Sequence, residues 1–246
     1  MSWPNDTVVT GDLTVPVRAM NAVLISALAV PLVVVARRRL DRRPWAGLGL
    51  DRLSRAARPF LVGVAAFLVP SAIGLTVALL TGWTDLRPQV PWSTIVGWAG
   101  LLVVLVFFFE ALPEELIFRG YLQRNLMTAM APWAAAMVQA ALFTVFGVAL
   151  WVASAGWGVL AERGLLFFGF GVVLGLLRLQ TGSVWTPIGF PLAFQGVAQS
   201  LLSDRMSTSS SDALMLSAFV SAFVLATTLM AFWSPRAVNW SRPEPE

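Results

Sequence analysis

Two adjacent glutamates, Glu114 and Glu115, follow a long apolar run, and Arg119 comes four residues after the second of them. A carboxylate can hold or move a proton, and an arginine one helical turn away can pair with it. Ionisable groups at membrane depth are costly. Two interpretations are open: a helix cap with a surface ion pair, or a buried site. In the buried site, Glu115 and Arg119 pair while Glu114 faces a cavity and handles a proton or a water molecule.

A third carboxylate, Glu110, precedes Glu114 by four residues. If a helix continues through Pro113, Glu110 and Glu114 point in about the same direction. Pro113 also suits the first turn of a new helix, where its missing N–H costs nothing. The position of Glu110 relative to the other carboxylates therefore depends on the course of the helix at Pro113.

The chain contains neither histidine nor cysteine. Imidazole is the side chain whose proton exchanges most readily near neutral pH, so any acid–base chemistry falls to the carboxylates. The commonest nitrogen and sulfur ligands of transition metals are also missing, and we predict no metal site and no cofactor. Glutamine side chains can donate hydrogen bonds but cannot shuttle protons near neutral pH.

Composition places the chain in a membrane. Hydrophobic residues make up 57% of the 246 residues and charged residues only 12%, against about 45–50% and about 25% in soluble domains. We predict an all-α polytopic membrane helix bundle, with about seven transmembrane helices in one integral membrane domain over residues 1–246 and with lipid as a partner. The predicted spans are 17–36, 59–80, 92–112, 131–153, 164–179, 184–203 and 213–233.

All 17 basic residues are arginine, and eight of them fall in the first connecting loop, 37–58. With seven spans, 13 arginines lie on the side of that loop, Arg119 and Arg236 among them, and 4 lie opposite. The positive-inside rule then predicts a multi-pass protein of the cell membrane with an outside N-terminus and a cytoplasmic 37–58 loop. Because topology explains the arginines, we predict no nucleic-acid partner.

Residues 114–124, EELIFRGYLQR, resemble the EExxxR motif of the CPBP intramembrane proteases. This family includes the CAAX prenyl endopeptidases and the bacterial Abi-type membrane proteins. Phe146 to Leu150 stands where the family has FxxxH, and residues 175–188 are similar to the segment that leads into its closing HxxxN motif. The resemblance implies a CPBP-like core at about 100–203, built around an intramembrane cavity, and an intramembrane glutamic endopeptidase activity.

The resemblance also implies roles for single residues. Glu114 would be the general base for a water, and Glu115 with Arg119 the supporting pair. Leu150 stands where the first histidine belongs, while Pro191 and Gln195 replace the histidine and asparagine of HxxxN. Losing one oxyanion donor costs about 2.7–4 kcal/mol in a well-studied hydrolase. We therefore predict a divergent or catalytically impaired member, a pseudoenzyme, although Gln195 could still donate a hydrogen bond.

The predicted site has two parts. Its catalytic residues are Glu114, Glu115, Arg119 and Gln195. Its cavity-binding residues are Glu110, Gln139, Phe146, Leu150, Pro191 and Gln199. Gln139 lies eleven residues before Leu150, about three helical turns, and so shares its face with Phe146 and Leu150. The glutamines have an alternative role as hydrogen bonds between helices, a common use of polar side chains in membranes.

Two functions of different classes follow. The first is a divergent endopeptidase that cuts membrane-associated peptides or proteins, with Glu114 activating water and Gln195 or Gln139 polarising the scissile carbonyl. The second is a non-catalytic binding, immunity or assembly protein that holds a peptide, a lipidated protein or a hydrophobic ligand in the family cavity. A transporter with Glu110 and Glu114 as a proton relay is a third possibility.

Overall fold

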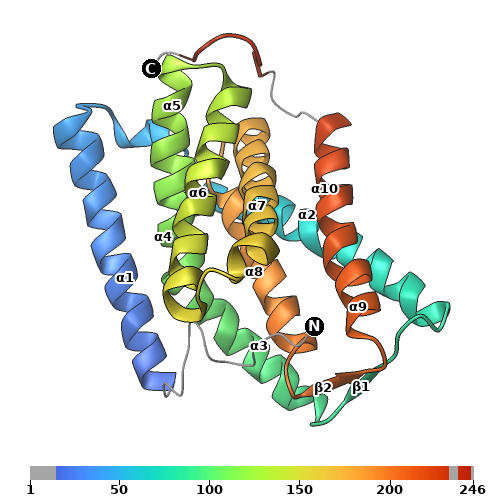
Figure 1. The fold of residues 1–246 in the computed structure, drawn as a ribbon. Helices are drawn as coiled ribbons and strands as arrows, with labels where there is room; N and C mark the ends of the chain where they lie inside the picture. The colour runs from blue at the N-terminus through green and yellow to red at the C-terminus, as the bar shows by residue number, and fades with distance from the viewer. Residues whose placement is uncertain (1–14, 233–237, 245–246) are drawn as a thin grey trace.

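A bundle of long helices, with one small two-stranded sheet at an end, forms the chain in a computed structural model that describes residues 15–232 and 238–244 (Figure 1). Six helical stretches in these ranges are long and apolar enough to cross a membrane. A seventh helix, α8, has 17 residues. The predicted all-α polytopic bundle is thereby confirmed.

Most helices follow the predicted spans, although α2 begins at Leu53 and not near 59, and α7 is longer than the predicted 164–179. The long helices are α1 (Val15–Val35), α2 (Leu53–Leu80), α3 (Trp92–Val106), α6 (Pro132–Ala155), α7 (Val159–Thr181), α8 (Trp185–Leu201) and α10 (Ser221–Phe232). The short helical segments are η1 (Ala36–Leu40), η2 (Trp45–Leu48), η3 (Phe107–Ala111), α4 (Leu112–Glu115), η4 (Leu116–Leu122), α5 (Gln123–Ala129), α9 (Ser211–Leu214) and η5 (Met215–Val220).

The third helix does not end near residue 112 as predicted. It continues without a break from Trp92 to Ala129, with Pro113 inside it. Proline removes one helical hydrogen bond and crowds the carbonyl one turn back. The π-helical turn of η3 ends at Ala111, two residues before Pro113, and the Ser26 hydroxyl of α1 donates a hydrogen bond to the Phe108 carbonyl within that turn. The wider turn and the neighbouring helix together accommodate the proline.

Helix α8 crosses α2 at very short range through two glycines. A Cβ atom at Gly63 would lie 1.9 Å from the Thr186 carbonyl oxygen, and one at Gly189 would lie 2.3 Å from the Phe60 carbonyl oxygen. Small residues let helix backbones approach closely in membranes. The crossing fixes α8 near the centre of the bundle, where an aromatic core surrounds it. That core is Phe67, Phe170, Phe190, Phe194, Phe219 and Phe223.

A short antiparallel ribbon closes one end of the bundle. Strands β1 (Leu86–Pro88) and β2 (Met206–Thr208) pair with Leu86 opposite Thr208. The backbone N–H of Ser209 donates to Oδ1 of Asp85 over 2.7 Å, and this bond lowers the pKa of the Asp85 carboxyl. The connection before α3 is thus tied to the connection after α8.

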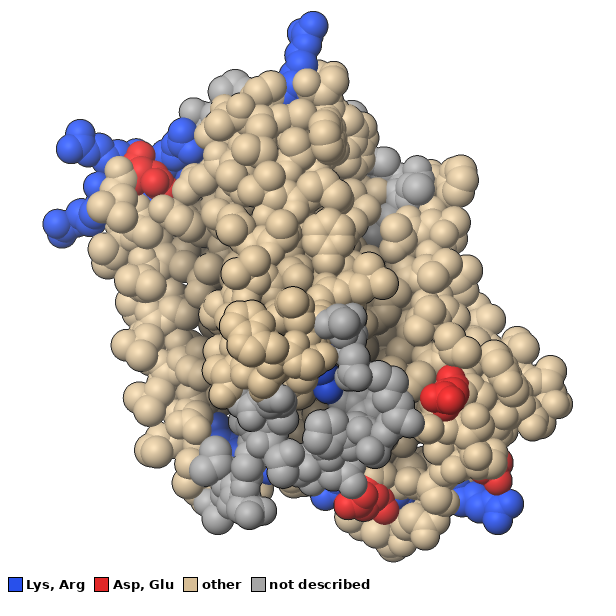
Figure 2. Space-filling model, in the orientation of Figure 1, with Lys and Arg blue, Asp and Glu red and all other residues tan. Residues whose placement is uncertain are grey.

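Arginines gather at the opposite end, where their side chains project from the first loop, while the middle of the visible face carries almost no charge (Figure 2).

Some of the arginines are buried inside the protein. Arg37 is fully buried and donates to the Pro44 carbonyl over 3.1 Å and to Asn125 Oδ1 over 3.2 Å, which anchors the first loop on α5. Arg119, grouped with the loop arginines in the topology prediction, instead lies inside the bundle. Arg236 lies outside the described residues.

Candidate functional site

Glu115 and Arg119 form a buried ion pair. Arg119 Nη1 lies 2.7 Å from Glu115 Oε1, and the two side chains are 0% and 2% exposed. The guanidinium carbon lies 4.3 Å from the centre of the Phe143 ring on α6, a cation–π contact. The pair therefore fastens the helix that carries the carboxylates to α6, and it does not lie at a surface.

Polar atoms continue from this pair along the same helix. Gln123, one turn beyond Arg119, is fully buried and donates to the Gly175 carbonyl of α7 over 3.0 Å. A Cβ atom at Gly175 would lie 3.0 Å from Gln139 Oε1, so Gln139 faces the same backbone. Glu115, Arg119, Gln123 and Gln139 each have at least one buried polar atom without a hydrogen-bond partner in the described residues. Together they form a polar column between three apolar helices.

Glu110 belongs to a second polar contact, on the side of α8. Gln195 Nε2 donates to both carboxylate oxygens of Glu110, over 3.2 and 3.1 Å. Gln195, which the resemblance places at the asparagine of HxxxN, thus donates to a carboxylate of its own chain. Pro191, one turn earlier on α8, is buried.

Glu114 lies between these two contacts and differs from both of its neighbours. Its side chain is half-buried, and it makes no hydrogen bond or ion pair within the described part of the chain. Glu110, Glu115 and Arg119 are close enough to act on it electrostatically. Of the three carboxylates on this helix, Glu114 is the one that a ligand could engage without breaking an existing bond.

The other residues predicted to bind a ligand in the cavity differ in how far the bundle covers them. Phe146 is 43% exposed, with its ring 5.5 Å from that of Phe118, and Leu150 is 57% exposed. Gln199 is exposed on α8. Gln139 and Leu150 share a face of α6, because eleven residues make about three turns. The neighbouring helices cover the Gln139 end of that face but not the Leu150 end. Gln139 consequently joins the polar column, away from Phe146 and Leu150.

Sequence reasoning missed two residues of this arrangement. Gln123 continues the four-residue spacing of Glu115 and Arg119, and this spacing could have identified it. Phe143 shares a helical face with Gln139, but only the structure shows that it lies under the Arg119 guanidinium.

Comparison with known proteins assigns the central part of the chain. Residues 96–193 match the family described as type II CAAX prenyl endopeptidase Rce1-like. The match covers less than half of the 246 residues, so it is this central part of the chain that is similar to that family. The Rce1-like segment runs from α3 to α8, so it includes the carboxylates, Leu150 and Pro191 and ends two residues before Gln195. No curated protein and no solved structure matches the chain.

Proposed function

We propose that this Rce1-like membrane protein binds membrane-anchored peptides without hydrolysing them. The observation that carries the proposal is the chemistry of positions 150 and 191. Leu150 and Pro191 stand where the resemblance implies imidazoles, and neither side chain can exchange a proton or donate a hydrogen bond. A water activated by Glu114 would therefore have no imidazole beside it, and any further proton transfer would fall to neighbouring carboxyl groups.

The contacts of Gln195 support the same proposal. In a hydrolase this position would donate to the oxyanion of the tetrahedral intermediate. Here the Gln195 amide already donates to both oxygens of Glu110. If the Gln195 amide turned to a substrate, the half-buried Glu110 carboxylate would lose these hydrogen bonds. That loss would raise the free energy of the transition state.

The proposed ligand is a peptide whose lipid anchor lies in the membrane, since the family name refers to peptides that carry a prenyl group. Glu114 would accept a hydrogen bond from a peptide N–H, because it is half-buried and makes no bond within the described chain. The exposed apolar side chains of Phe146 and Leu150 would contact the anchor. With the Arg-rich end in the cytoplasm, as the positive-inside rule predicts, such a peptide would approach from the cytoplasmic side.

A second candidate is the divergent endopeptidase, and the state of Glu114 is the observation that favours it. A half-buried carboxylate beside Glu110 and Glu115 is a suitable base for a bound water. In that case Gln195 would have to leave Glu110, or Gln139 would have to turn, before a carbonyl could be polarised.

One assay separates the two candidates. The purified protein in lipid nanodiscs is mixed with a dye-labelled, farnesylated CAAX peptide; binding is followed by fluorescence polarisation and products by mass spectrometry. We expect saturable binding without product and weaker binding to Glu114→Gln. Asp212→Asn, which removes an exposed carboxylate on α9, is the matched control and should bind like wild type.

The possible results divide clearly. A cleaved peptide that appears with wild type and disappears with Glu114→Gln would establish the endopeptidase. Absence of binding by a folded wild-type protein, or equal binding by Glu114→Gln, would overturn the proposed ligand site.

A further inference from the structure

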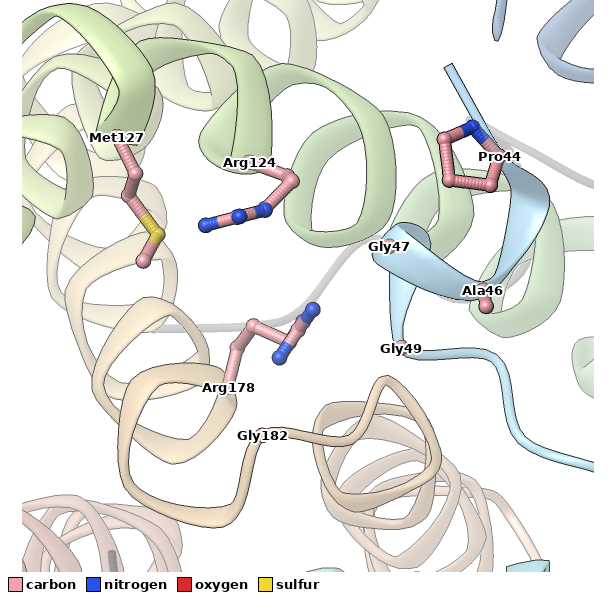
Figure 3. Close-up of a pocket in the computed structure, with 8 residues that line it drawn as sticks. All are labelled: Pro44, Ala46, Gly47, Gly49, Arg124, Met127, Arg178 and Gly182. Atoms are coloured by element: carbon pink, nitrogen blue, oxygen red, sulfur yellow. The ribbon is translucent and has the colours of Figure 1, made fainter. Parts of the chain in front are cut away.

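A concavity of about 370 Å³ lies at the Arg-rich end of the bundle. It is bounded by η2, by α5 and by the end of α7, and two of its lining residues, Arg124 and Arg178, are arginines (Figure 3). None of its lining residues, all of which the structure describes, is acidic. Arg124 comes ten residues after Glu114, roughly 15 Å along the helix axis. This basic pocket is therefore separate from the candidate site at Glu114.

The position of Arg178 in the basic pocket is built into the backbone. Its side chain is buried, and Nη2 donates to the Leu48 carbonyl of η2 over 3.0 Å. Gly49 follows with φ of 75°, and a Cβ atom there would lie 2.4 Å from Nη2. Only glycine provides both this conformation and this space. A guanidinium has five N–H donors, so a bond to Leu48 and a contact with an anion are compatible.

Arg124 already holds an anionic group of the chain itself. Its Nη1 lies 3.5 Å from Glu244 Oε2, and the backbone N–H of Glu244 donates to the Met127 carbonyl over 2.8 Å. Arg124 and Met127 both line the basic pocket. A carboxylate from 120 residues further along the chain is thus held by one of the two arginines that line the pocket.

We propose that the basic pocket binds a phosphoryl group, and that the Glu244 carboxylate competes with this group for Arg124. The lining carries two positive charges, and Figure 3 shows both guanidinium groups bordering the same space. Guanidinium forks match the oxygens of a phosphate, which carries more charge than one carboxylate. The volume is near the lower end of the ~300–1,000 Å³ of ligand pockets.

The phosphoryl group could come from a phospholipid or from a soluble phosphate compound. The position of the pocket at the Arg-rich end of a membrane protein suits a headgroup, because basic pockets between spans bind anionic headgroups. A soluble compound would reach the same arginines from water. The two sources share one chemistry, and the choice of probe distinguishes them.

The test uses the purified full chain in a neutral detergent, with dioctanoyl phosphatidic acid and inorganic phosphate as probes and isothermal titration calorimetry as the readout. We expect Arg124→Gln to weaken binding of the active probe about tenfold. Glu244→Gln should strengthen it about twofold to fivefold, because a competing, partly buried ion pair is removed. Arg87→Gln, which removes a 76% exposed arginine at the β1 end, is the matched control and should change nothing.

Each result decides the proposal. Binding of phosphatidic acid but not of phosphate assigns a lipid headgroup, and binding of phosphate assigns a soluble compound. Binding of neither probe to the folded protein overturns the proposal. Equal losses in Arg124→Gln and Arg87→Gln also overturn it, because they indicate non-specific attraction between charges. Arg124 is only partly buried whereas Arg178 is buried, so the Arg124 variant is the one to test first.

Discussion

Glu114 and Glu115 are adjacent in sequence but lie in different environments. Glu115 is 2% exposed and bound to Arg119 at 2.7 Å, whereas Glu114 is half-buried and has no bonded partner in the described chain. One of the two carboxylates therefore holds helices together, and the other is available to a ligand. Two of the three motif residues, Glu115 and Arg119, stabilise the bundle. The presence of the EExxxR motif in a sequence is therefore better evidence for the fold than for hydrolysis.

The same contrast explains how the motif could persist without catalysis. A buried charge that loses its partner is strongly destabilising, so Glu115 and Arg119 depend on each other whatever the protein does. Leu150 and Pro191, which the resemblance places at the positions of two histidines, have no charge and so need no charged partner. Single substitutions can separate the structural half of the motif, Glu115 with Arg119, from Glu114, the half proposed to bind a ligand.

Arg119→Leu should have the largest effect, because it leaves Glu115 buried and unpaired. We expect a loss of about 3–5 kcal/mol in the free energy of unfolding, seen as a fall of roughly 10 °C in the melting temperature in detergent. The double variant Glu115→Leu/Arg119→Leu should recover much of this loss, since no charge then remains unpaired. A single variant that melts like wild type would refute the buried pair.

Gln195→Leu should have an intermediate effect. It removes the amide that donates to both oxygens of Glu110, and we expect a loss of about 1–3 kcal/mol in the free energy of unfolding. Gln199→Leu, one turn later on the exposed side of α8, is the control and should change stability by less than about 0.5 kcal/mol. Equal melting temperatures for the two variants would show that the Glu110–Gln195 contact contributes nothing.

Glu114→Gln should have the smallest effect on stability, below about 0.5 kcal/mol, because no internal bond is lost. The same change should weaken binding of the farnesylated peptide about tenfold, since a charged acceptor becomes a neutral one. Thermal melting and peptide titration of one preparation measure both quantities. A large loss of stability would place Glu114 with Glu115 in the structural half of the motif.

Much of the fold could be predicted from sequence, because each span is an apolar run bounded by polar or glycine-containing segments. The course of the helix through Pro113 could not, since it depends on a π-helical turn and on the Ser26 hydroxyl of a distant helix. Local sequence favours a helix start at this proline. The contact between α1 and this turn joins residues that are far apart in sequence, so it can be identified only from the three-dimensional structure.

The candidate site divides in the same way. The Glu115–Arg119 pair follows from four-residue spacing, and that spacing extends to Gln123. The contact of Glu110 with Gln195, 85 residues apart, requires α8 to cross beside η3, and no local pattern reports this. Exposure of Leu150 and Gln199 was also unpredictable, because periodicity identifies a face of a helix but not what covers that face.

The most direct test of binding without hydrolysis compares protein N-termini in cells. Membrane fractions from cells that express wild type or Glu114→Gln at equal levels are analysed by mass spectrometry for newly formed N-termini. We predict identical sets of N-termini, with both proteins folded and abundant. N-termini that are present with wild type, vanish with Glu114→Gln and are reproduced when the purified wild-type protein cuts the corresponding peptides would contradict the account.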